Sequence, residues 1–356
     1  MKSKIAQVLS QFGVQAEAQP YGNGHINHTY VVNSKPRYIL QRINKDVFQN
    51  PTDVMENIAA VTEHLQKKLK AVGGDPIRET LTLIPTLDGQ KWYIDEDGDF
   101  WRMYLFIEDS LALDRAEDAK TFATSAHAFG RFQKMLADFP AEELHEVIPK
   151  FHNTANRLLQ FKEALQKDTA GRAASVQPEI DFVLSHAHLV SVVTDALADG
   201  SVPLRVTHND TKLNNVLLDA KTMDAVCVID LDTVMPGSLL YDFGDSLRFG
   251  ASTGAEDETD LSKIEFDLTY FKAFAKAYLE ELGDVMTARE RELLPFSALL
   301  LTLECGIRFL TDYLNGDTYF RIHREHHNLD RARTQFKLVA DMEAKMDKMK
   351  RIVTEC

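Results

Sequence analysis

The amino-acid sequence predicts an α+β protein with two lobes, a small antiparallel-sheet lobe over residues 1–106 and a larger, mainly helical lobe over residues 107–356. Short runs rich in β-branched and aromatic residues lie within the first hundred residues. Further along, apolar positions instead recur every three or four residues. With 356 residues and 44% hydrophobic content, the chain is long enough to form two hydrophobic cores.

The small lobe is expected to contain strands around one helix. Residues 53–70 repeat apolar side chains at the period of a helix that buries one face. The strand candidates are residues 30–32, 37–43, 91–94 and 100–106.

In the larger lobe, the last predicted helix begins with a capping box formed by Thr287 and Glu290. Its apolar stretch, residues 296–310, is shorter than the roughly 20 residues that cross a bilayer. We therefore expect a core helix and no membrane partner. The predicted helices are residues 119–139, 154–167, 178–197, 268–282 and 287–314.

The composition excludes several classes of partner and site. A net charge of −14 disfavours a nucleic-acid surface, which would need a basic stripe. Cys227 and Cys305 lie in a predicted strand and a predicted helix, so we expect reduced thiols rather than disulfides or zinc ligands. The first residues lack the pattern of a signal peptide, which predicts a cytoplasmic protein.

Residues 207–218, followed by the apolar run 226–229 and Asp230, form the most informative stretch of the chain. Asp210 is placed to accept a proton from an attacking hydroxyl group. Asn215 and Asp230 offer the oxygen ligands that Mg²⁺ prefers. Lys212 would hold the γ-phosphate as a compact point charge. This combination predicts a centre for phosphoryl transfer.

The spacing of this stretch brings its polar residues together. Residues 216–218 and 225–229 flank a polar turn and predict a hairpin, which would fold Asp230 back towards Asp210 and Asn215. Asn and Asp are also the commonest turn and cap residues, so a single one of them would indicate only a loop. The combination with the hairpin favours the functional interpretation.

A glycine pair, Gly22 and Gly24, comes just before the strand at 30–32. Glycines let backbone amides approach phosphate oxygens closely, so such a loop can cover a nucleotide. Taken alone, two glycines around one residue more often mark an ordinary turn. The phosphate role depends on the downstream centre.

These patterns resemble the aminoglycoside phosphotransferase and choline kinase group, relatives of protein kinases whose catalytic loop reads His-x-Asp-x-x-x-x-Asn. The resemblance spans nearly the whole chain and implies a protein-kinase-like fold that uses ATP and Mg²⁺. More narrowly, the chain is similar to bacterial N-acetylhexosamine 1-kinases, which phosphorylate the anomeric hydroxyl of N-acetylglucosamine or N-acetylgalactosamine. The matching segments are residues 21–27, 207–217, 229–238, 242–250 and 304–310.

Two positions depart from the kinase pattern. Asn27 stands where the loop would have a third glycine, and would bind phosphate or brace the loop. Gln41 stands where the strand would carry a lysine for the α- and β-phosphates. Either Gln41 contacts phosphate as a neutral donor, or Mg²⁺ and Lys212 supply the charge; a solvated strand residue is the alternative.

The resemblance also implies where ATP and the acceptor bind. The main chain of the strand end would hold the adenine, at Tyr104, Leu105, Phe106 and Ile107, with Ile39 and Ile229 as apolar walls. Besides Asp210, the residues implied to contact the sugar are His25, Phe249, Arg308 and Tyr319. From the residues alone, Arg308 would as readily form an ion pair with Glu304, four residues earlier on the same helix.

The predicted function is therefore an ATP- and Mg²⁺-dependent N-acetylhexosamine 1-kinase with a small-molecule sugar as its partner. The alternatives are another small-molecule kinase, for choline, homoserine or an aminoglycoside, and a pseudokinase, which the missing strand lysine would favour. The sequence leaves the oligomeric state open, and a monomer is compatible with it.

Overall fold

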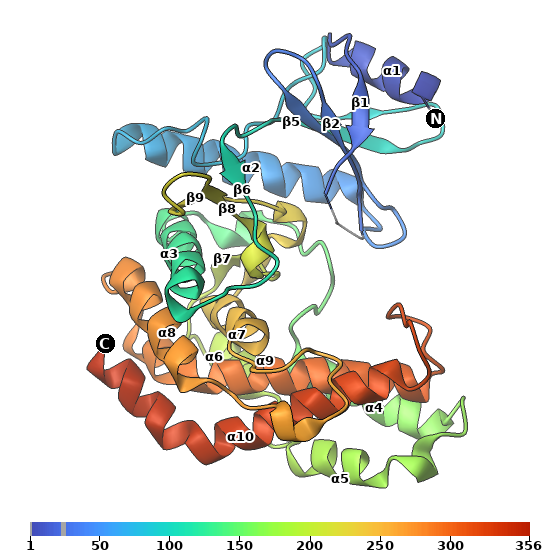
Figure 1. Ribbon diagram of the computed structural model, residues 1–356, viewed down its shortest axis with the longest axis vertical. Helices are drawn as coiled ribbons and strands as arrows, with labels where there is room; N and C mark the ends of the chain where they lie inside the picture. The colour runs from blue at the N-terminus through green and yellow to red at the C-terminus, as the bar shows by residue number, and fades with distance from the viewer. Residues whose placement is uncertain (1, 23–25) are drawn as a thin grey trace. The chain divides into compact units, whose positions relative to one another are not determined.

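A computed structural model describes residues 2–22 and 26–356 and divides the chain into two compact units (Figure 1). The predicted fold class is confirmed, because one unit is built on an antiparallel sheet and the other is mainly helical. Unit 1 comprises Met1–Ala112, Met135–Pro149 and Asn215–Pro236, and unit 2 comprises Leu113–Lys134, Lys150–Asn214 and Gly237–Cys356.

Unit 1 contains a five-stranded antiparallel sheet with the order β1-β2-β3-β5-β4. All four predicted strands are present. The register of the central pair places Gln41 of β3 opposite Arg102 of β5. The strands are β1 (Ala18–Pro20), β2 (His28–Val32), β3 (Tyr38–Arg42), β4 (Tyr93–Ile94) and β5 (Phe100–Leu105).

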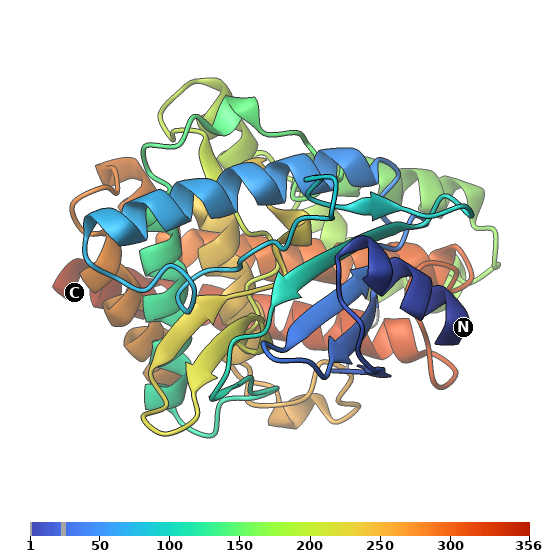
Figure 2. The same cartoon turned by 90° about the horizontal axis from the view of Figure 1, so that it is seen from above.

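Two helices of unit 1 provide its core. Helix α1 (Lys2–Gln11) buries Val8 and Leu9 in a cluster with Leu40 of the sheet, and Figure 2 shows it in dark blue beside the strands. Helix α2 (Pro51–Ala71) buries the predicted apolar stripe. It begins with Pro at its first position, where the missing N–H costs no hydrogen bond.

A smaller sheet of unit 1 has the order β6-β8-β9 and contains the predicted hairpin. At its end, the Ile229 N–H donates to the Asn215 carbonyl over 2.9 Å. The 3-10 helix η4 (Leu231–Thr233) follows directly. The strands are β6 (Ser110–Leu111), β8 (Val216–Asp219) and β9 (Ala225–Val228); the short helix η1 (Ala141–Glu143) completes the unit.

Unit 2 is organised around helix α9 (Ala288–Leu314), which packs against α4, α7 and α10; Figure 1 shows α9 and α10 side by side. The predicted capping box of α9 is present. By length and composition α9 could cross a membrane, but 89% of its apolar window is buried inside the structure. The core assignment is thus supported by burial, whereas the length argument was wrong.

Helix α7 (Leu239–Gly250) packs against α9 with its backbone very close. A Cβ atom on Gly244 would lie 2.4 Å from the Ser297 carbonyl oxygen, well inside van der Waals contact. Only glycine fits at this contact, so α7 and α9 meet backbone to backbone there.

The sequence patterns missed α1 in the small lobe, where only one helix was expected, and also α7 and α10 (His327–Glu355), and they merged α5 with α6. The predicted helix 178–197 breaks after Ser185, where the His186 N–H closes the end of α5. The other elements are α3 (Ala119–Met135), α4 (Thr154–Lys167), η2 (Ala173–Ser175), α5 (Gln177–Ser185), α6 (Val192–Ala198), β7 (Arg205–Thr207), η3 (Leu213–Asn215), β10 (Met235–Gly237), η5 (Leu261–Lys263) and α8 (Leu268–Leu282).

Candidate active site

The loop after β7 in unit 2 carries Asp210 and is braced by a buried carboxylate from α7. Asp242 accepts the N–H of His208 at 3.0 Å, the N–H of Asn209 at 2.8 Å and the Gln133 amide at 2.6 Å. Burial raises the pKa of Asp242, and these three donors act in the opposite direction. Asp242 therefore shapes the loop rather than binding metal.

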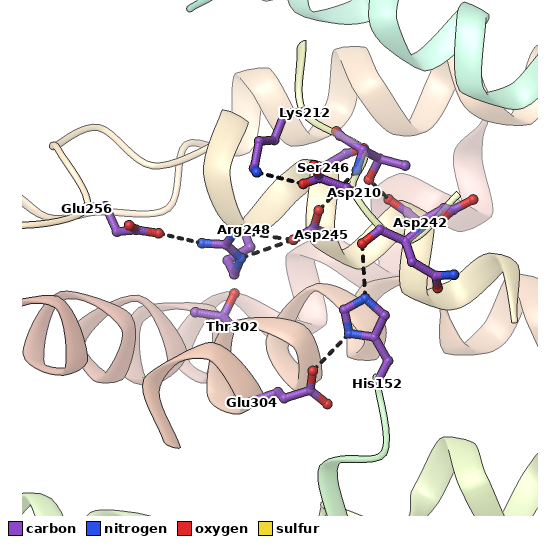
Figure 3. A network of polar contacts seen from close by, with 12 residues as sticks. His152, Asp210, Lys212, Asp242, Asp245, Ser246, Arg248, Glu256, Thr302 and Glu304 are labelled. Carbon is purple, nitrogen blue, oxygen red and sulfur yellow. Dashed lines mark hydrogen bonds and ion pairs between the residues drawn. The ribbon is translucent and has the colours of Figure 1, made fainter. Parts of the chain in front are cut away.

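A second carboxylate one turn along α7 holds the other side of the loop (Figure 3). Asp245 accepts the Thr211 N–H at 3.1 Å and pairs with Arg248 at 3.2 Å. Although burial opposes the effect, the Arg248 charge lowers the pKa of Asp245. The N-terminus of α7 is capped by Ser238, whose hydroxyl oxygen accepts the Leu240 N–H.

Within this braced loop, the side chain of Asp210 keeps 25% of its surface exposed, whereas His208 and Asn209 are buried. The His208 ring nitrogen accepts the Asp210 N–H at 3.3 Å, as expected for a structural histidine. Lys212 lies 2.7 Å from the Asp210 carboxylate. Burial lowers the pKa of Lys212, but the neighbouring Asp210 carboxylate raises it by more, so the ammonium stays charged.

A cavity of about 420 Å³ in unit 2 opens beside Lys212 and Phe249. Phe249 is 40% exposed, so it is not a core residue, although its sequence context alone would suggest one. Phe122 and Tyr270 also line the cavity. An apolar ring face next to charged groups suits a ligand that has both polar and apolar surfaces.

Arg308 lies half-buried on α9 with its guanidinium over two aromatic rings, 5.6 Å from Phe151 and 5.4 Å from Phe320. Glu304 instead bonds to other residues of unit 2, so the alternative ion pair with Arg308 does not form among residues 2–22 and 26–356. Tyr319 is 72% exposed next to Phe320. Arg308 and Tyr319 thus share one aromatic patch.

In unit 1, the Gln41 side chain is hydrogen-bonded to a buried arginine, Arg102, whose role the sequence patterns missed. Its side-chain oxygen accepts two hydrogen bonds from Arg102, at 2.9 and 2.8 Å, and its amide donates to Thr29. Arg102 is 1% exposed and pairs with Asp232 at 2.5 Å. Gln41 is therefore not a solvated strand residue. The available signal was one Arg inside the apolar strand 100–106.

Asn27 belongs to the same network, since its amide donates to Asp232 at 2.5 Å and its oxygen accepts the Asn44 N–H. Asn27 was predicted to bind phosphate or to brace the loop. Its contacts with Asp232 and Asn44 are bracing contacts within unit 1. Gly22 has a φ of +76°, which favours glycine. The predicted residues Gly24 and His25 lie outside the described residues.

The two predicted metal ligands both belong to unit 1. Asn215 ends η3, and Asp230 is exposed in a left-handed conformation just before η4. The hydrogen bond from Ile229 to Asn215 joins the two chain segments. An amide and a carboxylate oxygen fit Mg²⁺, which takes few protein ligands and keeps waters. Asp232 is committed to Arg102 and Asn27.

The strand end predicted to hold adenine has most of its N–H groups in use. Leu105 donates to Thr82 and Phe106 donates to Arg37. Tyr104 lies opposite Ile39 inside the sheet. Of the four predicted residues, Ile107 has an N–H for which the described part of the chain offers no acceptor. The apolar walls, Ile39 and Ile229, are partly exposed.

The chain is similar to known proteins in both fold and sequence. Three solved structures are similar to 98% of this chain: a microcompartment-associated aminopropanol kinase (TM-score 0.63, 15% identity, 98% of that chain), an aminoglycoside phosphotransferase from Alicyclobacillus acidocaldarius (0.64, 12%, 96%) and a spectinomycin phosphotransferase in complex with ADP and spectinomycin (0.60, 14%, 99%). These likenesses show the shared fold. The model of the phosphotransferase enzyme family matches residues 17–292, most of the sequence. The chain therefore belongs to the phosphotransferase enzyme family.

Proposed function

We propose that this phosphotransferase is an ATP- and Mg²⁺-dependent kinase that phosphorylates the C1 hydroxyl of an N-acetylhexosamine. The observation that carries the proposal is Asp210, a partly exposed carboxylate on a loop whose neighbouring residues are buried and braced by α7. A carboxylate held in this way can accept a proton without leaving its position.

The reaction assigns a separate task to each group. Asp210 accepts the proton of the C1 hydroxyl as the sugar oxygen forms its bond to the γ-phosphorus, and the bond to the bridging oxygen breaks to release ADP. Lys212, beside Asp210, places a positive charge at the transferring group. Asn215 and Asp230 would hold Mg²⁺, which would neutralise charge on the phosphate oxygens.

The charge that a strand lysine would provide comes in this proposal from Arg102. Its guanidinium is too buried to touch a ligand directly, but it makes two hydrogen bonds to Gln41 and an ion pair with Asp232. Arg102 thereby adds a positive charge close to the segment that carries Asp230, where Asp232 balances it. If Arg102 has this role, the missing strand lysine does not by itself favour a pseudokinase.

The cavity beside Phe249 favours a neutral acceptor. Three acidic and three basic side chains line it, so it presents no excess of negative charge to a cation such as choline. Glu256 is paired with Arg248, and Asp267 caps α8. The exposed face of Phe249 offers the apolar contact that a sugar ring uses. A kinase for a cationic acceptor remains the second candidate.

The free thiols Cys227 and Cys305 are buried, and burial raises the pKa of Cys305 to about 11, so both are unreactive. A cytoplasmic location, where ATP is available, accords with unpaired cysteines.

The proposal is tested by measuring ADP release with N-acetylglucosamine, N-acetylgalactosamine, choline, homoserine and kanamycin as acceptors. We expect turnover with the hexosamines. In Asp210→Asn, kcat should fall by at least about 10³-fold while sugar binding is retained. Asp195→Asn, at an exposed position on α6, is the matched control and should be fully active. Turnover with choline or kanamycin but not with the hexosamines would contradict the proposed acceptor. Full activity of Asp210→Asn would contradict the role of Asp210 as the base.

A further inference from the structure

A buried histidine of unit 2 lies between a glutamate and the loop that carries Asp210 (Figure 3). His152 is 8% exposed, just before α4. Its Nδ1 lies 2.8 Å from a carboxylate oxygen of Glu304 on α9, and its Nε2 lies 3.3 Å from the carbonyl oxygen of Asn209. The ring thus connects the central helix to the loop.

Both neighbours of the ring are hydrogen-bond acceptors, because a carboxylate and a backbone carbonyl have no proton to donate. Both contacts are hydrogen bonds only when each ring nitrogen carries a proton, which makes the ring a cation. Glu304 provides the opposite charge. Burial raises the pKa of Glu304, but His152, Arg308 and Thr154 together lower it by more. Asp245 and the ring of Tyr241, 5.3 Å away, also lie near the His152 ring, and the Arg157 charge interacts with Glu304.

The carbonyl that His152 contacts belongs to the peptide joining Asn209 to Asp210. Asn209 has a φ of +65°, in the left-handed region that is uncommon for non-glycine residues and that asparagine adopts more readily than most. Asp242 binds the N–H of Asn209 on one side, and His152 binds its carbonyl on the other. The orientation of the Asp210 backbone is therefore set from both sides.

We propose that His152 and Glu304 form a positioning pair for Asp210, acting through the Asn209 carbonyl and without touching the substrate. This inference rests on the proposed role of Asp210 as the base. The pair also adjoins the aromatic patch of Arg308 and Tyr319, because Phe151, whose ring lies under the Arg308 guanidinium, is the residue before His152. No residue of the pair has an assigned role in the family pattern described above.

The test replaces His152 and a matched histidine. In His152→Gln we expect kcat to fall about 100-fold, as a displaced catalytic group does, while the KM values for ATP and acceptor change less than about two-fold. His186 is also 8% exposed and lies between a backbone carbonyl, that of Phe182 at 2.7 Å, and a glutamate, Glu343 at 3.1 Å. His186→Gln should lower Tm as much as His152→Gln does but keep the wild-type kcat.

Glu304→Gln provides a second variant that keeps the volume of the core. The amide oxygen can still accept from Nδ1, but a neutral ring then turns an unprotonated Nε2 to the Asn209 carbonyl. We expect kcat to fall about 10-fold, with unchanged KM values, and the double variant to be no slower than His152→Gln alone.

The outcomes separate the two proposals. Equal kcat values for His152→Gln and His186→Gln would overturn the positioning pair, and so would a loss confined to the KM of the acceptor. A wild-type enzyme that ignores hexosamines but phosphorylates another acceptor would overturn the proposed substrate only. The same comparison of variants would then be made with that acceptor.

Discussion

The two units each hold a buried ion pair beside a residue proposed for the reaction, but the two pairs use different cations. In unit 1, Arg102 pairs with Asp232, two residues after the proposed metal ligand Asp230. In unit 2, His152 pairs with Glu304 and contacts the residue before Asp210. Arginine keeps its charge at every accessible pH, whereas histidine is the side chain whose charge changes near neutrality. The pair near the proposed metal ligand therefore has a permanently charged guanidinium, and the pair near the loop that carries Asp210 has an imidazole.

The largest effect is expected for Arg102→Met, which leaves the Asp232 carboxylate buried without its cation. We expect the free energy of unfolding to fall by about 3–5 kcal/mol, measured by urea denaturation. Arg78→Met is the control, since Arg78 pairs with Asp219 in the same unit while partly exposed. It should cost less than about 1 kcal/mol. Equal losses would show that the buried pair has no special role.

Introducing at position 41 the lysine of the kinase pattern should destabilise the protein and weaken ATP binding. Gln41→Lys replaces the acceptor of two Arg102 hydrogen bonds with a second positive charge. We expect a loss of about 2–3 kcal/mol in unfolding free energy and a higher KM for ATP. Gln41→Glu keeps an acceptor and should be tolerated. A gain in ATP affinity from the lysine would mean that Arg102 does not take its place.

Thr154→Val probes the pair of unit 2 without removing either charge. The Thr154 hydroxyl donates to Glu304 over 2.7 Å in the core, and valine has the same shape without this donor. We expect a loss of about 1–2 kcal/mol in stability and a fall in kcat smaller than that of Glu304→Gln. An unchanged stability would show that Glu304 does not depend on this bond.

The smallest effect is expected outside both ion pairs, at the capping box of α9. Thr287→Ala removes the side chain that accepts the Glu290 N–H. The unfolding free energy should fall by about 1 kcal/mol, with kcat and both KM values unchanged. A change in kcat here would mean that loss of stability alone alters turnover, and would weaken every kinetic comparison above.

Local patterns predicted much of this structure. The helix at 53–70, the hairpin before Asp230 and the cap at Thr287 were each predicted correctly, because periodicity, turn residues and capping are properties of neighbouring residues. The resemblance to the phosphotransferase family, carried in part by His208, Asp210 and Asn215, is also confirmed.

The parts that could not be predicted depend on pairing between distant segments. Arg102 meets Gln41 only through the register of β3 and β5, and Asp232 reaches Arg102 from 130 residues along the chain. His152 has no local signal at all. Helix α10 was missed because its apolar stripe is narrow among many charged residues.

The contact at Gly244 has a consequence for how this enzyme can change over time. Asp242 and Asp245, the carboxylates that hold the catalytic loop, lie within two residues of a point where even one methyl group would force the helices apart. Phe249, on the last turn of the same helix, is exposed instead. Substitutions can accumulate at that end of α7, while the segment around Gly244 tolerates almost none.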